Sequence, residues 1–142
     1  MIGRSERSVR KANNQLVWLV IVYGVASLLH FAHNAEYLNE YPNLPSWLSR
    51  SEIYVVWLCI TALGASGYLL HRAGYEAAGL ALVGAYAALG FDGLLHYTRA
   101  PAAAHTAAMN LSIWFEVAAA ALLLGAVLIR ARQYALRRLA SS

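Results

Sequence analysis

Five ionisable side chains have types and spacings that could do chemistry together. His30 and His33 lie three residues apart, Asp92 and His96 lie four apart, and His105 follows shortly after. On an α-helix, residues three or four apart share one face. If the segments that carry them are helical, each of the first two pairs presents both side chains to the same neighbour.

Imidazole nitrogen is a ligand for zinc, copper, iron and nickel, and a carboxylate can complete or orient the ligand shell. We therefore expect a transition-metal or haem site built from the side chains of His30, His33, Asp92, His96 and His105. Asp92 could ligate the ion directly. It could instead accept a ring N–H from His96 and fix the orientation of that ring. The expected activity is redox chemistry or action on a lipid-soluble substrate.

Two alternatives use the same side chains without a metal. One is acid–base chemistry of the isomerase type, with Glu116 and Asp92 as the catalytic carboxyl groups and histidine as their partner. The other is a hydrogen-bond network that only joins helices, with partners drawn from Tyr23, Asn34, Tyr97, Thr106, Asn110 and Ser112. A transporter or a non-catalytic subunit is also compatible with the sequence.

The elements that must position these residues are membrane helices. Hydrophobic residues make up 60% of the 142 residues and charged residues only 13%, well below the usual charged share of roughly 25% in a soluble domain. Four apolar stretches are each near the roughly 20 residues that cross a bilayer. We predict an all-α, four-helix transmembrane bundle in a single membrane domain over residues 1–142, with spans at about 16–37, 53–70, 77–97 and 105–129.

Lysine and arginine are distributed unevenly over the flanks of the spans. Nine lie in the N-terminal flank, the second connection and the C-terminal tail, whereas only Arg50 and Arg99 lie in the first and third connections. The positive-inside rule then predicts that both termini are cytoplasmic, in a multi-pass protein of a bacterial inner membrane. With that topology, all histidines except His71 fall with Asp92 in the outer layer. Glu116 lies deeper, about 16 Å below His105 on the rise of a helix.

The charge and the cysteine content limit the classes of binding partner and cofactor that we expect. The formal charge of +4 comes from basic residues beside apolar spans, which favours contact with lipid headgroups and argues against nucleic acid. The single cysteine, Cys59, excludes an internal disulfide and an iron–sulfur cluster held by cysteines. The expected partners are the lipid bilayer and a hydrophobic small molecule. A homo-oligomer or a larger membrane complex is compatible with the chain.

Two short resemblances accompany this pattern. The layout resembles the emopamil-binding-protein family of four-span sterol isomerases, in the positions of His30, Pro45, Trp47, Glu52, Gly90, Asp92, Met109, Asn110 and Trp114. That resemblance implies a metal-free membrane isomerase, although the second histidine set is foreign to the family. The run of Asp92, His96 and His105 is similar to the copper-ligand pattern of membrane-bound methane and ammonia monooxygenases. Each resemblance covers a handful of residues, so neither identifies the family.

The predicted topology can be tested with reporter fusions. Fusions after Trp47 and after Pro101 should report the outer compartment, and a fusion at Ser142 should report the cytoplasm, because of the nine-to-two distribution of basic residues. An outer signal at Ser142 would contradict the topology and would move the histidines to the inner side.

Overall fold

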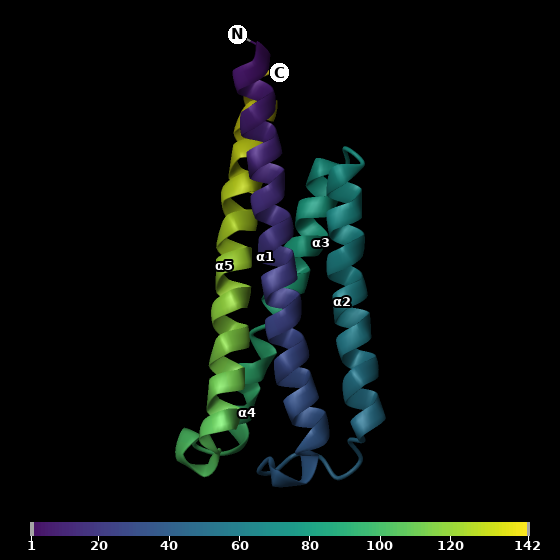
Figure 1. Ribbon diagram of the computed structural model, residues 1–142, viewed down its shortest axis with the longest axis vertical. Helices are drawn as coiled ribbons and strands as arrows, with labels where there is room; N and C mark the ends of the chain where they lie inside the picture. Colours follow the sequence, from purple (N-terminus) through teal and green to yellow (C-terminus); the bar gives the residue numbers. More distant parts are fainter. Residues whose placement is uncertain (1, 142) are drawn as a thin grey trace.

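The fold is known from a computed structural model, which describes residues 2–141 and the side chains of residues 14–141. Those residues form four long helices joined by short helical turns (Figure 1). The elements in chain order are α1 (Ile2–Glu36), η1 (Leu38–Glu40), α2 (Arg50–Arg72), α3 (Glu76–Leu89), η2 (Asp92–Leu95), α4 (His96–Arg99), η3 (Ala102–Ala104) and α5 (Ala107–Ala140).

Four segments are long and apolar enough to cross a membrane: Asn14–Glu36, Arg50–Arg72, Glu76–Arg99 and Ala107–Ala140. This confirms the predicted all-helical fold with four spans and indicates a multi-pass membrane protein. Many large apolar side chains point outward from these helices, among them Trp18, Leu69, Leu122 and Leu128. A soluble monomer would bury such side chains, whereas a bilayer solvates them.

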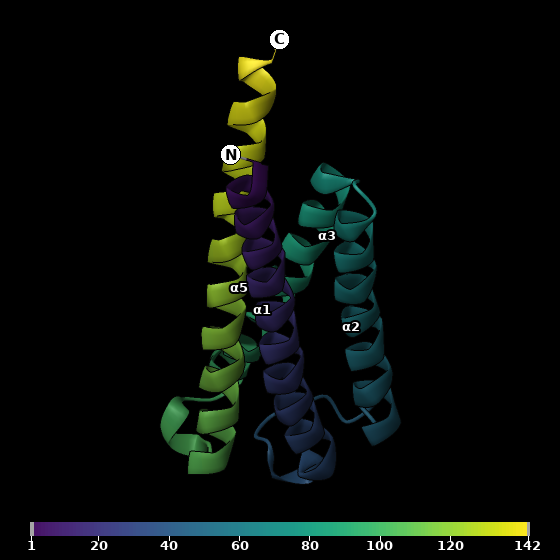
Figure 2. The same cartoon turned by 45° about the horizontal axis from the view of Figure 1, so that its top comes forward.

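The four long helices pack in a ring, in which α1 contacts α2, α2 contacts α3, α3 contacts α5, and α5 contacts α1. Both termini lie at one end, where α1 and α5 extend past the α2–α3 turn (Figures 1 and 2). The short elements η1, α4 and η3 lie at the opposite end. An even number of spans places the termini on the same side of a membrane, and which side that is stays a prediction.

The main core lies between α1, α3 and α5. Tyr23, Val83, Tyr86, Ala120 and Leu123 are almost completely buried there. A second, smaller cluster joins α1 to α2 through Phe31, Ala35 and Ile53. Glycine on α2 and α3 allows these two helices to approach closely, as small residues do in membrane helix pairs.

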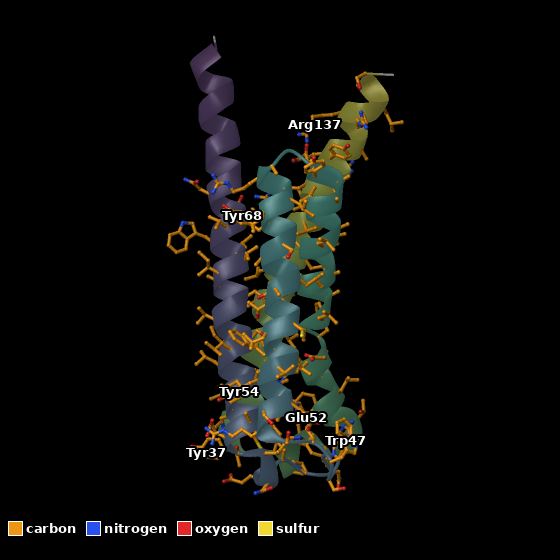
Figure 3. All side chains as sticks on the ribbon, turned by 90° about the vertical axis from the view of Figure 1, so that its right-hand side faces the viewer. Tyr37, Trp47, Glu52, Tyr54, Tyr68 and Arg137 are labelled. Atoms are coloured by element: carbon orange, nitrogen blue, oxygen red, sulfur yellow. The ribbon has the colours of Figure 1, made fainter. Side chains whose placement is uncertain are left out.

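Polar contacts define the ends of the helices. Ser49 accepts a hydrogen bond from the Glu52 backbone N–H and donates to the Glu52 side chain, which caps α2. Glu36 on α1 pairs with Arg50 at 2.5 Å and accepts from the Tyr54 hydroxyl at 2.8 Å. Figure 3 shows Glu52 and Tyr54 at the same end as Tyr37 and Trp47, with Tyr68 and Arg137 toward the other end.

The third and fourth spans differ from the prediction. The segment expected as one helix over 77–97 ends its α-helical hydrogen bonding at Leu89, continues as the 3₁₀ turn η2, and resumes as α4. Two glycines, Gly90 and Gly93, lower helix propensity there. The fourth span begins at Ala107 after an N-cap at Thr106, so His105 precedes the helix and does not open it.

The α2–α3 packing gives a stability test at Gly79. A Cβ atom added to Gly79 would lie 2.4 Å from the backbone nitrogen of His71, so Gly79→Ala must push the two helices apart. We expect a loss of about 1–3 kcal/mol and a lower melting temperature in detergent. The matched control is Gly125→Ala, whose added Cβ meets nothing within 4 Å. Equal melting of the two variants would contradict the tight contact.

Candidate functional site

His30 lies at the centre of a group of polar side chains that we call the polar layer. Its members are His30, His33, Asn34, Asp92, His96, His105, Ser112 and Glu116. The ring of His30 is 1% exposed and lies on α1, facing α5. The Ser112 hydroxyl donates to the Met109 carbonyl at 2.9 Å, so its oxygen is free to accept from His30 Nδ1–H at 3.2 Å. His30 then carries its proton on Nδ1 and presents the lone pair of Nε2 to the interior of the bundle.

Asn34 connects the two most central histidines. Its side-chain Nδ2 lies 3.1 Å from His30 Nε2 and 3.4 Å from His96 Nε2. An amide NH₂ group has two hydrogens, so it can donate to both rings at once. Both Nε2 atoms are then acceptors. The position of Asn34 four residues after His30 places the amide directly over the ring.

Glu116 faces His30 from α5. The residue is completely buried, its Oε2 lies 3.7 Å from His30 Nε2, and neither carboxyl oxygen has a hydrogen-bond partner. One proton held by the pair leaves it without net charge, whether as carboxylic acid beside imidazole or as carboxylate beside imidazolium. A proton on either side chain therefore gives the same net charge inside the bundle.

The expected separation of Glu116 from the histidines is wrong. The helix that carries it begins at Ala107, which puts Glu116 about 13 Å along α5 from that end. His30 lies about 9 Å from the end of α1 at Glu36. The two residues therefore differ in depth by only a few ångströms, which their side chains can span. Glu116, which was expected to lie deeper, belongs to the polar layer.

Gly93 in η2 lies against this pair. A Cβ atom built on it would sit 3.5 Å from His30 Nε2 and 3.6 Å from Glu116 Oε2. Both distances are ordinary van der Waals contacts, so the absent side chain leaves a small open space beside both groups. The 3₁₀ turn thus places backbone without a side chain next to His30 and Glu116.

Asp92 lies next to Gly93 but does not act as predicted toward His96. Its buried Oδ1 has no hydrogen-bond partner among the described residues, and His96 Nε2 lies next to the Asn34 amide instead. The 3₁₀ turn removes the regular i, i+4 relation that was to place Asp92 and His96 on one helix face. Asp92 lines the cavity described below beside His30 and His96 without orienting the His96 ring.

His33 and His105 lie at the edge of the layer. His33 Nδ1 shares a 2.8 Å hydrogen bond with the Tyr41 hydroxyl, and the Tyr41 ring lies against both His33 and His96. Burial raises the pKa of Tyr41 to about 12, so its phenol keeps its proton near neutral pH. His105 Nδ1–H donates to the Pro101 carbonyl at 3.1 Å, and its ring centre lies 6.1 Å from that of His96.

The donors of the predicted metal site do not converge on one point. Among the described residues, no group of three or more His, Cys, Asp or Glu side chains is placed to hold a metal ion. The Nε2 atoms of His30 and His96 already accept hydrogen bonds from Asn34, and the Tyr41 ring stands between His33 and His96. As arranged, these side chains form a hydrogen-bonded layer in which the described donors do not share one binding point, and the metal or haem site stays a prediction.

A cavity of about 210 Å³ reaches this layer from the side of α2. Its polar wall contains His30, Asn34, Asp92 and His96, and its remaining lining is mostly apolar. The other lining residues are Phe31, Leu44, Leu48, Ile53, Val56, Gly93, Leu95 and Arg99. A mostly apolar cavity with a few convergent polar groups is the usual form of a site for an apolar ligand.

Comparison with known proteins does not identify a relative that shares this site. No protein-family model, no curated protein and no solved structure matches the chain. Neither the resemblance to the sterol isomerases nor that to the copper-containing monooxygenases gains support from these comparisons.

The sequence alone did not single out Gly93, Tyr41 or Arg99 as members of the site. The pattern G-x-x-G around Asp92 signals a helix break that could have pointed to Gly93. Tyr41 lies in the connection between the first two predicted spans. Its contact with two histidines depends on how the loop after α1 folds back, which no local pattern predicts.

The His30 tautomer can be tested through Ser112. Ser112→Ala removes the acceptor of His30 Nδ1–H, so we expect a loss of about 0.6–1.7 kcal/mol, the range measured for hydrogen bonds between membrane helices. In ¹⁵N NMR spectra, the wild type should show protonated Nδ1 and bare Nε2 for His30. Ser66→Ala on the exposed face of α2 is the control. A bare Nδ1 in the wild type would overturn the assignment.

Proposed function

We propose that this chain is a membrane-embedded enzyme of the isomerase class, which moves protons on a lipid-soluble molecule without a metal. The observation that carries the proposal is the buried contact between His30 and Glu116, with 3.7 Å between Nε2 and Oε2, beside an apolar cavity. An acid and a base placed together next to a ligand cavity are the two groups that such a reaction requires.

The hydrogen bonds of the layer favour one assignment of roles. His30 Nε2 is the base once its lone pair is released from the Asn34 amide, while Glu116 in its carboxylic acid form is the proton donor. Migration of a double bond would use both groups. Glu116 adds a proton to one carbon of the double bond, His30 removes a proton from the carbon on the other side of the resulting cationic centre, and transfer between the two side chains restores the starting state. Protons balance, and no oxidant or reductant is needed.

Asn34 and Ser112 would serve as positioning residues for this base. Ser112 holds the proton on Nδ1, and Asn34 holds the ring plane and links it to His96. His96 and Asp92 line the cavity and would contact the bound molecule on its polar side. With the proposed topology, cytoplasmic termini and an inner-membrane location, the site lies in the outer half of the bilayer.

A metal site is the second candidate function, and it is supported only by the ability of imidazole and carboxylate groups to bind metals. A rearrangement that freed His30 and His96 from Asn34 would be needed for it. Metal dependence is therefore one arm of the test that follows.

Deuterium incorporation tests the proposal without a known substrate. The purified protein in nanodiscs is incubated with a membrane lipid extract in deuterated buffer, and the lipids are analysed by mass spectrometry. Proton transfer to carbon should leave one deuterium on a lipid species. Glu116→Gln keeps the size of the side chain but removes the acidic proton, so incorporation should fall roughly 10²- to 10⁴-fold.

The matched control is Glu40→Gln, which changes an exposed carboxyl group in η1 outside the layer and should leave incorporation unchanged. Incorporation should also survive treatment with a chelator. Loss of incorporation with chelator and recovery with added metal would replace the proposal by the metal hypothesis. Absence of deuterium in every lipid with the wild type would reject proton transfer to carbon.

A further inference from the structure

The cavity opens sideways, toward the lipid. Two of its lining side chains, Val56 on α2 and Leu95 on η2, are 48% and 57% exposed. Both lie in segments that are apolar enough to cross a membrane, so the medium around them is hydrocarbon. Because η2 replaces regular helix here, the wall opposite α2 contains bare backbone at Gly93. A lipid-soluble molecule can reach the layer between α2 and η2 without passing through water.

A cation without a carboxylate partner stands at the outer end of this cavity. Arg99 closes α4 and lines the cavity, and its guanidinium donates a hydrogen bond to the Asn43 carbonyl at 3.3 Å. Arg50, the other basic residue of the outer connections, pairs with Glu36 at 2.5 Å. Among the residues that the structure describes, Arg99 makes no ion pair, which leaves its guanidinium available for an anion.

The two ends of the cavity differ in charge and depth. Arg99 and Asp92 are separated by seven residues of helical backbone, which corresponds to about 10–14 Å. Arg99 lies at the end of α4 and Asp92 at the start of η2, and both side chains line the cavity. The inner end, at Gly93, offers contact with His30, and the fully buried Glu116 lies next to both residues without lining the cavity.

We infer that the cavity binds a single-chain lipid with an anionic head group. The head contacts Arg99, and the adjoining part of the chain lies beside Gly93. The rest of the molecule leaves between Val56 and Leu95 into the bilayer. The volume of about 210 Å³ is below the roughly 300–1,000 Å³ of sites for drug-sized ligands, so only part of one chain fits. The inference rests on the proposed function for the reaction that follows binding, but not for binding itself.

Photolabelling tests the binding directly. A long-chain fatty acid with a diazirine in its chain is added to the protein in nanodiscs of neutral phosphatidylcholine, and labelled peptides are identified by mass spectrometry. Labels should concentrate on α2 around Val56 and on η2 around Leu95. The alcohol with the same diazirine chain should label these segments less, because it lacks the charge.

Two arginine variants separate binding at the cavity from general attraction to the surface. Arg99→Gln should lower labelling by the acid about fivefold, the weight of one exposed ionic contact, and should leave labelling by the alcohol unchanged. Arg50→Gln, on the same side of the membrane, should change neither. Equal labelling by acid and alcohol, an equal effect of both variants, or stronger labelling by a diazirine phosphatidylglycerol with two chains would overturn the inference.

A further pair of variants separates this inference from the proposed function. Glu116→Gln should keep the labelling pattern while it abolishes deuterium incorporation. Gly93→Ala should fold, since its methyl group makes only van der Waals contacts, and should keep the labels around Val56 and Leu95. Incorporation that persists without the predicted labels would reject the binding mode and leave the proposed function intact.

Discussion

The arrangement of the polar layer depends on the two hydrogen bonds of the Asn34 side chain. In hydrocarbon there is no water to satisfy a buried imidazole, so each ring nitrogen needs a partner from the protein. One amide group supplies that partner for His30 on its own helix and for His96 on α4. The same two bonds engage the lone pairs that a metal ion would need. A single side chain therefore accounts for both the cohesion of the layer and its poor fit to a metal.

Composition and hydropathy were sufficient for the fold but not for the break in the third span. Twenty apolar residues predict a helix because hydrocarbon forces backbone groups to pair within the segment. That rule holds for Arg50–Arg72 and fails after Leu89, where glycine weakens the helix and the chain continues as a 3₁₀ turn. Local propensity signals the weak point. Whether the helix actually breaks there depends on packing against α1 and α5, which a single sequence does not encode locally.

The sequence predicted which residues belong to the site better than it predicted how they are arranged. His30, His96 and Glu116 were singled out because ionisable residues in a span are costly, and all three lie in the layer. Their relations were missed because helix spacing says which residues share a face but not how neighbouring helices are aligned in depth. Glu116 lies in the layer because α5 packs against α1 with Glu116 beside His30. His33 moved to the edge because Tyr41 lies between it and His96.

The placement of α2 separates the shape of the ligand cavity from the groups proposed to transfer protons, two properties that usually constrain each other. The acid, the base and their positioning residues all lie on α1 and α5, with η2 completing the layer, whereas α2 contributes only apolar side chains, Ile53 and Val56, to the cavity wall. Substitutions on this face of α2 can widen, narrow or reshape the space for a ligand without disturbing a proton or a buried hydrogen bond. Such a division lets ligand preference diverge among descendants of one ancestor while the chemistry is retained. It also marks α2 as the helix to randomise when a new ligand is sought.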